Sequence, residues 1–272
     1  FLDIYMHAKR LGMLVTVYSN VSLERPRILD VFSEYPPQLI EITLYGSTED
    51  TFEKVTRLPK SFEAAMRGVE MVLGRVLFRS MKTMVLTVNR HELEALKSFA
   101  EKLGVQFRSD KILWPRLDGR KGPENFRLSP KEVIDLEKMD HEIQEEWSAQ
   151  DGIFSEKVNI LRKENTWICG GGFHSFHIDA YGRMSICQMT RYPAYDLRQG
   201  NLQDGWAFLG EIREEKRTLE TPCRTCSVGV MCTQCPGWSQ LVHGDHETPV
   251  DYICEIGHLR ADYLTSLYYN ED

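Results

Sequence analysis

The first 168 residues of this 272-residue chain contain no cysteine. The chain also lacks an apolar run as long as a membrane span, so we expect no membrane association. An excess of positive charge is absent too: the formal net charge is −7, which argues against a bare nucleic-acid-binding surface. The first 20 residues carry Asp3, Lys9 and Arg10 in an amphipathic pattern that does not fit a signal peptide. These absences leave an ordinary soluble globular protein as the expected class.

An initiating methionine is missing as well. Residue 1 is phenylalanine, and residues 1–10 already have a helical pattern. We therefore expect this sequence to be the later part of a longer protein whose N-terminal part precedes Phe1.

The first 115 residues alternate between helical and strand patterns. Short apolar runs rich in β-branched residues predict buried strands at residues 13–18, 39–45, 81–88 and 105–113. Such alternation is typical of parallel strands joined by crossover helices. Because four strands are too few for a closed barrel, we expect an α/β fold with a partial (β/α) barrel over residues 1–115.

A polar, glycine- and proline-rich stretch follows this region. It opens a predicted connector over residues 116–166. Ser129 and Pro130 predict a helix start with Glu132 in its first turn, and the helical pattern runs to about Ala149. A small cysteine-rich domain is predicted for residues 167–272.

All of the cysteines lie in that last segment, and four of them form the pattern C-x2-C-x5-C-x2-C. The seven are Cys169, Cys187, Cys223, Cys226, Cys232, Cys235 and Cys254. An odd number excludes complete pairing as disulfides, and a C-x2-C pair brings two thiolates together on one tight turn. The crowding indicates metal binding in a reducing compartment, so we expect a cytoplasmic protein.

Three interpretations compete for this cysteine pattern. Seven buried thiols without a metal would need chance crowding. The two C-x2-C pairs could make one zinc site, but the five-residue spacer is short for a zinc ribbon, and Cys169, Cys187 and Cys254 would have no role. Two iron–sulfur cubanes need up to eight ligands, which seven thiolates nearly supply, so ligand number favours iron and sulfur.

Residues 169–187 resemble the opening of a SPASM domain, the auxiliary-cluster domain of many radical SAM enzymes. The family pattern is a cysteine, a variable stretch, a glycine, four residues and a cysteine, which Cys169, Gly182 and Cys187 match. The C-x2-C-x5-C group, the distal Cys254 and the tail over residues 235–264 resemble this family too.

The resemblance departs from the family in one place. Three residues usually precede the fourth cysteine of the central group, whereas here only Thr233 and Gln234 do.

The resemblance implies two auxiliary [4Fe–4S] clusters. Cys223, Cys226, Cys232 and Cys254 would hold one cluster, and Cys169, Cys187 and Cys235 would hold the other. Fully ligated relatives have a further cysteine just upstream, but residues 161–168 contain none, so the second cluster would keep one non-cysteine position. The histidines nearby, His174, His177, His243 and His246, are interpreted as surface or loop residues.

The front of the chain resembles the radical SAM core. Residues 15–20 resemble its third strand, and residues 40–73 are similar to its fourth strand and the following helix, although Lys60 stands where relatives often have glycine. By this resemblance Ser19, Asn20 and Thr43 are candidate S-adenosylmethionine contacts at strand ends. The alternative for each is a polar residue that caps the next element.

The C-x3-C-x2-C loop that defines the family is absent, because no cysteine precedes Cys169. The resemblance therefore implies that S-adenosylmethionine and a third [4Fe–4S] cluster belong to the intact parent, and that this chain alone is inactive. It implies a radical SAM oxidoreductase or maturase with a peptide or protein substrate and an electron donor such as flavodoxin or ferredoxin. The alternatives are a non-enzymatic iron–sulfur module for electron transfer or peptide binding, and a structural zinc protein.

Overall fold

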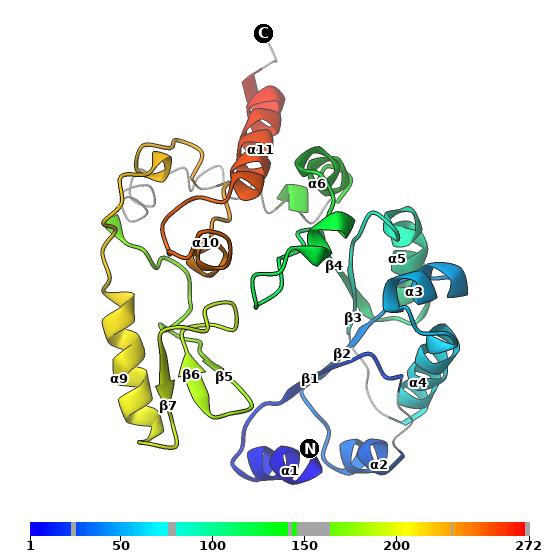
Figure 1. The fold of residues 1–272 in the computed structure, drawn as a ribbon. Coiled ribbons are helices and arrows are strands. Elements are labelled where there is room, and N and C mark those ends of the chain that lie inside the picture. The colour runs from blue at the N-terminus through cyan, green and yellow to red at the C-terminus, as the bar shows by residue number, and fades with distance from the viewer. Residues whose placement is uncertain (23–25, 76–79, 141–142, 146–163, 230, 270–272) are drawn as a thin grey trace. The chain divides into compact units, whose positions relative to one another are not determined.

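The computed structural model describes residues 1–22, 26–75, 80–140, 143–145, 164–229 and 231–269. The chain forms two compact units. The first unit comprises Phe1–Leu113 with Phe126–Leu128, and the second comprises Trp114–Asn125 with Ser129–Asp272. Each unit is described by itself (Figure 1). No helix in the described part of the chain is long and apolar enough to cross a membrane.

The first unit is a four-stranded parallel sheet with helices between its strands, as the alternating pattern predicts. The strands pair in the order β1-β2-β3-β4. Its elements are α1 (Leu2–Arg10), β1 (Thr16–Ser19), α2 (Pro26–Glu34), β2 (Leu39–Thr43), α3 (Glu49–Thr56), α4 (Ser61–Arg75), β3 (Ser80–Met84), a 3-10 turn (Arg90–Glu92), α5 (Leu93–Lys102) and β4 (Gln106–Asp110).

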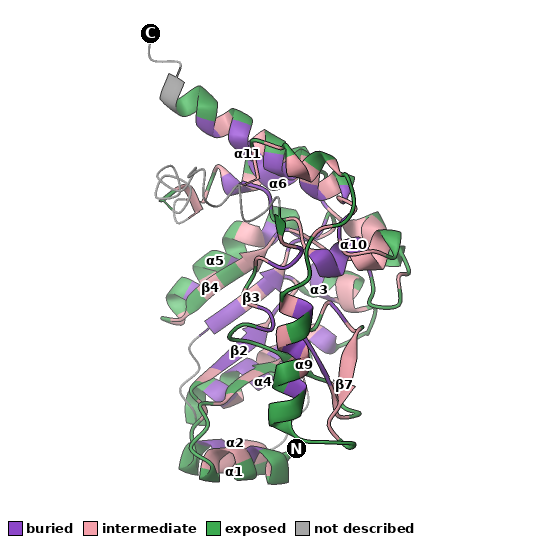
Figure 2. Ribbon diagram, turned by 90° about the vertical axis from the view of Figure 1, so that its left-hand side faces the viewer, coloured by how far each residue is buried: buried purple, intermediate pink, exposed green. Residues whose placement is uncertain are grey.

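The core of this unit lies between one face of the sheet and these helices. Side chains alternate along a strand, so Ile40 and Ile42 of β2 share that face, and Ile42 pairs in register with Met81 of β3. All three are almost fully buried, together with Ala65 on α4 and Leu96 on α5. Figure 2 shows this burial as purple along β2 and β3, with green on the outer faces of the helices.

The opposite face of the sheet carries charge. Glu41 is 5% exposed and contacts Arg108 at 3.0 Å and Lys82 at 3.4 Å. The Ser80 hydroxyl donates to the same carboxylate at 3.2 Å. Burial alone would raise the pKa of Glu41, but these partners lower it below its usual range. The network keeps a buried carboxylate ionised on β2.

Two of the strand predictions need correction. The segment at residues 13–18 is not a buried strand: β1 begins at Thr16, and Tyr18 is 63% exposed. The reason is that β1 pairs only with β2 and forms an edge of the described sheet. The strand predicted for residues 81–88 ends at Met84, because the Asn89 side chain bonds the Leu86 amide and the Met84 carbonyl and turns the chain.

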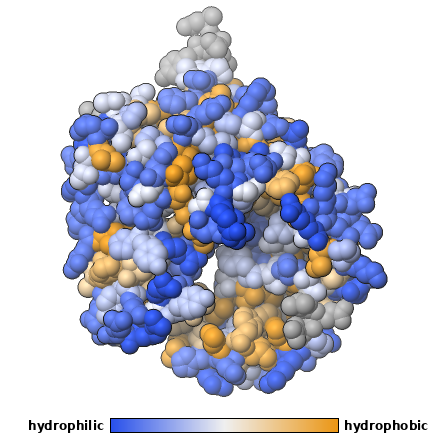
Figure 3. Space-filling model, viewed as in Figure 1, coloured by the Kyte–Doolittle hydropathy of each residue, from blue (hydrophilic) through white to orange (hydrophobic). Residues whose placement is uncertain are grey.

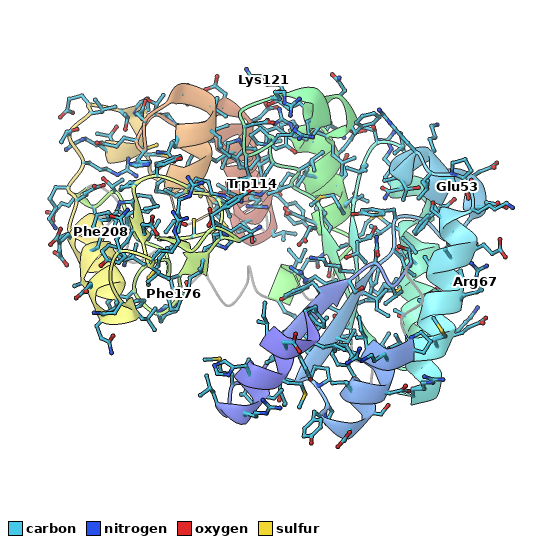
Figure 4. All side chains as sticks on the ribbon, turned by 60° about the horizontal axis from the view of Figure 1, so that its bottom comes forward. Glu53, Arg67, Trp114, Lys121, Phe176 and Phe208 are labelled. Atoms are coloured by element: carbon cyan, nitrogen blue, oxygen red, sulfur yellow. The ribbon has the colours of Figure 1, made fainter. Side chains whose placement is uncertain are left out.

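The helix pair after β2 has a strained connection. Thr48 caps α3, and the helix ends at Arg57 with φ 57°. Lys60, just before α4, has φ 62°. Both residues occupy the left-handed region that favours glycine, which explains why a glycine is expected at position 60. On the outer side of α4, Arg67 pairs with Glu63 at 2.6 Å and points away from the sheet (Figure 4).

The second unit contains α6 (Pro130–Glu137), β5 (His177–Ile178), β6 (Arg183–Ser185), β7 (Ala194–Asp196), α9 (Leu202–Arg213), a 3-10 turn (Pro222–Arg224), α10 (Pro236–His243) and α11 (Asp251–Tyr269). A 3-10 turn at Gly122–Phe126 precedes α6. The three short strands form an antiparallel sheet in the order β5-β6-β7.

The predicted start of α6 is confirmed, but its predicted end is wrong. Ser129 and Glu132 form a reciprocal capping box, in which each side chain bonds the other residue's backbone. The helix ends at Glu137 with Lys138 as C-cap, rather than continuing to about Ala149. Residues 141–142 and 146–149 of that predicted helix lie outside the described residues.

A small core joins the antiparallel sheet to α9. It contains Trp167, Met184, Ile186, Leu209 and Ile212. Phe208, labelled on α9 in Figure 4, packs against Tyr195 of β7 with ring centroids 6.0 Å apart. Gly182 turns the chain from β5 to β6 at φ 78°.

Candidate functional site

Four of the seven cysteines line one cavity in the second unit, which we call the four-thiol cavity. They are Cys223, Cys226, Cys232 and Cys254, and the cavity measures about 40 Å³. The rest of its lining is Thr166, Ile168, Arg217, Val228, Gly229, Gln234 and His258. This is the set of four thiols that the sequence resemblance assigns to one cluster.

Tight turns and one helix position these four thiols. Cys223 lies in the 3-10 turn that Pro222 opens, and the Cys232 amide donates to the Gly229 carbonyl at 3.3 Å. Cys254 lies in the first turn of α11. Three residues further along α11, a Cβ at Gly257 would come within 3.0 Å of Cys232. The absence of a side chain at Gly257 lets the helix approach the loop closely.

Gln234 connects the loop and the helix at this cavity. Its amide nitrogen donates to the Val250 carbonyl at 2.9 Å and to the Cys254 sulfur at 3.3 Å. Its amide oxygen accepts from the Val250 backbone amide at 3.2 Å. Burial raises the pKa of the Cys254 thiol, and the neighbouring Cys223 and Cys226 raise it further. The thiols are therefore close enough to influence one another's charge.

The other three cysteines form a second group, which we call the three-thiol group. Burial raises the pKa of Cys235 to about 11, and Cys187 and Cys169 add to this shift by their charge. Backbone amides of Gly237 and Trp238 act in the opposite direction. A Cβ at Gly171 would lie 3.6 Å from the Cys169 sulfur and 3.7 Å from the Cys187 Cβ. The Thr190 hydroxyl, which lies 3.6 Å from the Cys187 sulfur, is 2.7 Å from the position of a Cβ at Gly237, two residues after Cys235. Cys169, Cys187 and Cys235 therefore share one neighbourhood.

Arg213 of α9 fixes the loop that carries Cys169. Its Nη1 donates to the Cys169 carbonyl at 2.7 Å and to the Gly171 carbonyl at 3.1 Å. The guanidinium also lies 5.5 Å from the centre of the Phe173 ring. Cys187 follows β6, and its sulfur lies 3.6 Å from the Thr190 hydroxyl.

The last C-x2-C pair is divided between the two groups. Cys232 lines the four-thiol cavity, whereas Cys235 lies with Cys169 and Cys187. Among the residues that the structure describes, no three His, Cys, Asp or Glu side chains are arranged to hold a single metal ion.

Two of the nearby histidines are not simple surface residues. His174 and His243 are exposed, but His177 and His246 are half-buried. The Nε2 atoms of His177 and His246 are buried and have no hydrogen-bond partner within the described ranges. Burial lowers the pKa of His177, and the charge of Arg191 adds to this effect.

The candidate cofactor contacts lie in the first unit and are only partly brought together. Ser19 and Asn20 line a pocket of about 280 Å³ whose other walls include Phe32, Ile40 and Met71. Thr43 is not among the residues that line this pocket. Hydrophobic surface gathers at this end of the first unit, near α1 and α2 in Figure 3.

Ser19 and Asn20 also make local hydrogen bonds of the capping kind. The Ser19 hydroxyl accepts from the Val21 amide at 3.0 Å, and Asn20 accepts from the Ser22 amide at 3.3 Å. The two interpretations of these residues, cofactor contact and local cap, are both compatible with this geometry.

Sequence reasoning missed the polar residues that organise these sites, namely Gln234, Arg217 and Glu92. Glu92 accepts hydrogen bonds from the Ser47 amide at 2.6 Å and the Thr48 amide at 3.1 Å, and from both hydroxyls. Burial alone would raise the pKa of Glu92, but these bonds lower it to about 2. In the sequence, the one feature that could have indicated a role for Gln234 at the site is its position between Cys232 and Cys235.

One curated protein and several solved structures, which involve S-adenosylmethionine (AdoMet) by their names, are similar to this chain. No model of a known protein family matches the chain. The chain is 21% identical over 256 residues to the AdoMet-dependent heme synthase of Methanosarcina barkeri (strain Fusaro / DSM 804), a match that covers 86% of this chain and 72% of that protein.

Solved structures agree on the fold. Native anSMEcpe with bound AdoMet and Kp18Cys peptide superimposes with a TM-score of 0.58 at 13% identity, covering 93% of this chain and 74% of that one. A histidine-tagged form of anSMEcpe with bound AdoMet superimposes with a TM-score of 0.55 at 16% identity, covering 94% of this chain and 73% of that one. The chain has an α/β fold of the radical SAM type. The strand–helix alternation predicted for the first unit is therefore confirmed at the level of the fold.

Proposed function

We propose that this chain is the auxiliary-cluster-bearing part of a radical SAM oxidoreductase or maturase, with a SPASM-type second unit that holds two [4Fe–4S] clusters. The observation that carries this proposal is the division of the seven cysteines into a four-thiol cavity and a three-thiol group. A single zinc site built from the two C-x2-C pairs would need Cys232 and Cys235 together, and they lie in different groups.

The residues present fit an iron–sulfur cluster in the four-thiol cavity. Thiolates are the soft ligands that such clusters use. A buried donor of Arg217, which lines this cavity, has no acceptor among the described residues, as expected where sulfur atoms would accept. Cys223, Cys226, Cys232 and Cys254 would hold this cluster, which supplies one-electron transfer when bound.

Cys169, Cys187 and Cys235 would hold the second cluster and leave one position for another ligand. Arg213 and the glycines of the 169–172 loop keep the Cys169 turn close to Cys187.

The S-adenosylmethionine part of the proposal draws on the relatives. Both anSMEcpe structures contain AdoMet, and the curated relative is AdoMet-dependent by its name. Ser19, Asn20 and Thr43 are proposed cofactor contacts at the strand ends. These 272 residues hold no C-x3-C-x2-C motif. We therefore propose that the third [4Fe–4S] cluster, which begins the reaction in the family, has its ligands outside them and that this chain alone cleaves no S-adenosylmethionine.

The proposed substrate is a peptide or protein side chain, because a structural neighbour carries a bound peptide. A flavodoxin or ferredoxin is the proposed electron donor, and the reducing conditions that thiolate ligands need favour a cytoplasmic location.

The test compares two cysteines that are only three residues apart. After anaerobic reconstitution with iron and sulfide, Cys232→Ala is expected to remove the same electron paramagnetic resonance (EPR) signal as Cys226→Ala. Cys235→Ala is expected to remove the same signal as Cys187→Ala. Each variant would lose about four irons per chain, since each cubane contains that number.

The exposed neighbour Ser227 provides the matched control, and Ser227→Ala should keep the full iron content. Loss of one and the same metal in Cys232→Ala and Cys235→Ala would contradict the two-cluster proposal.

A further inference from the structure

Arg217 presents a buried, unpartnered hydrogen-bond donor at the four-thiol cavity. The residue lines the cavity, and its Nη1 is buried without an acceptor in the described part of the chain. A buried guanidinium nitrogen without a partner is costly, because the group has lost its hydration. Such an atom indicates that an acceptor normally occupies the space beside it.

The rest of the Arg217 side chain is held in place. Its Nε donates to the Asn165 carbonyl at 3.1 Å. Its backbone amide donates to the Glu164 carbonyl at 2.9 Å, and its own carbonyl accepts from Arg224 at 2.8 Å. Because the guanidinium is planar, fixing Nε restricts where Nη1 can lie.

The carboxylate of Glu247 does not accept a hydrogen bond from this donor. The charge of Arg217 helps to lower the pKa of Glu247. The oxygens of Glu247, however, accept hydrogen bonds from the Thr218 amide, the Thr218 hydroxyl and the Leu219 amide at 2.8 to 3.0 Å. The Nη1 donor of Arg217 is therefore left for the cavity.

We propose that Arg217 is a positioning residue that donates a hydrogen bond to a sulfur atom of the cluster in the four-thiol cavity and raises that cluster's reduction potential. This inference rests on the proposed function. The physical reason is that the reduced cluster carries one more negative charge than the oxidised cluster. A fixed cation and an N–H donor beside sulfur stabilise that extra charge.

The effect is selective for one cluster. The cation fixed beside the three-thiol group is a different one, since Arg213 donates to the carbonyls of the Cys169 loop. Removing Arg217 should therefore move the potential of the four-thiolate cluster and leave that of the three-thiolate cluster unchanged.

The experiment measures the midpoint potentials of both clusters by EPR-monitored redox titration of the whole reconstituted chain. The signals are assigned with Cys226→Ala and Cys235→Ala. In Arg217→Met, the ratio of reduced to oxidised four-thiolate cluster at the wild-type midpoint should fall roughly tenfold, which is about 59 mV for one electron. Arg217→Lys keeps the charge but loses the planar fork, so it should shift the potential in the same direction by less.

Arg198→Met is the control, because Arg198 is exposed, pairs with Asp196 at 2.7 Å and is not among the residues that line the cavity. It should leave both potentials unchanged. A wild-type potential in Arg217→Met with full iron content would overturn the inference, and so would an equal shift in Arg198→Met.

If Arg217→Met cannot hold iron, Arg217→Lys decides: an unchanged potential overturns the inference, and a smaller downward shift supports it. Failure of the proposed function is distinguishable, because the wild-type chain would then contain no cluster to titrate.

Discussion

Glu92 shows how one buried carboxylate organises the loop that follows β2. Two backbone amides and two hydroxyl groups of Ser47 and Thr48 all donate to it. The loop lies at the carboxyl end of a parallel strand, the end at which α/β proteins place their ligands. Glu92 thus stabilises a part of the first unit on which a cofactor site would depend.

The lowered pKa of Glu92 gives a pH dependence with a definite sign. The pKa of Glu92 is about 2 in the folded chain against an ordinary value of 4.5. Its contribution to the free energy of unfolding is therefore complete above pH 4.5 and is lost as the pH falls from 4.5 toward 2. Glu92→Gln should lower the free energy of unfolding near neutral pH by about 2–3 kcal/mol. Urea unfolding at several pH values measures this.

The control for Glu92 is Glu101, an exposed residue of α5, and Glu101→Gln should have little effect. If the wild type and Glu92→Gln differed equally at pH 7 and pH 2.5, the assigned role of the carboxylate would be wrong.

Individual residues also mark the limit of prediction from sequence. Cysteine spacing alone indicates which thiols can share a turn, because chain distance restricts them. It does not indicate that Gln234 and Glu92 form hydrogen bonds with distant segments, or that a donor of Arg217 is buried at the four-thiol cavity. Those features depend on contacts between segments far apart in sequence. His177 and His246 were interpreted as loop or surface residues for the same reason.

At the scale of elements, the turn between β5 and β6 depends on one glycine. Asp179 accepts from the amides of Tyr181 and Arg183 at 2.8 and 3.0 Å, and Gly182 follows at φ 78°. A side chain at this position fits the space but strains the backbone. The turn leads through β6 to Cys187, which explains why the motif places a glycine five residues before that cysteine.

Two glycine substitutions should therefore change the stability of the chain in opposite directions. Gly182→Ala should cost about 1–2 kcal/mol, the penalty of the left-handed region for an L-residue. Gly210→Ala, inside α9 with open space around its Cβ, should gain about 0.5–1 kcal/mol. Thermal unfolding of the two variants measures both effects, and a loss of stability in both would contradict this explanation.

A buried ion pair joins α6 to α11. Arg260 donates to both oxygens of Glu137 at 2.8 and 2.6 Å, and the two side chains are only 9% and 7% exposed. Arg260→Met leaves Glu137 buried without its partner and should cost about 3–5 kcal/mol. The double variant Glu137→Leu with Arg260→Met should recover most of that loss, since no charge is then left unpaired.

The exposed pair of Lys131 and Asp135 on α6 is the matched control. Lys131→Ala should cost at most about 0.5 kcal/mol in the same chemical unfolding experiment. A cost for Arg260→Met no larger than this would show that the buried pair does not hold α6 against α11.

Elements were predictable from sequence where a local pattern decides them. The start of α6 at Ser129 and Pro130 depends on local residues, and its prediction is confirmed. The end of α6 and the exposure of β1 depend on what packs nearby, and hydrophobic periodicity carries no such information.

For the whole molecule, the parallel sheet followed from the alternation of helices and strands, and the comparisons confirm an α/β fold of the radical SAM type. The grouping of the thiols follows from the fold of the second unit, in which α11 and the loop before α10 meet. The resemblance to a known family implies the same grouping of the thiols. The spacing of the cysteines alone does not decide between a zinc site and iron–sulfur clusters. The metal itself therefore has to be measured.

The proposed pair of [4Fe–4S] clusters is tested by the content of iron, acid-labile sulfide and zinc in the chain after anaerobic purification and reconstitution. Seven thiolates divided four and three predict about eight irons and eight sulfides per chain, with little zinc. One or two zinc ions per chain with no sulfide would contradict the presence of two [4Fe–4S] clusters.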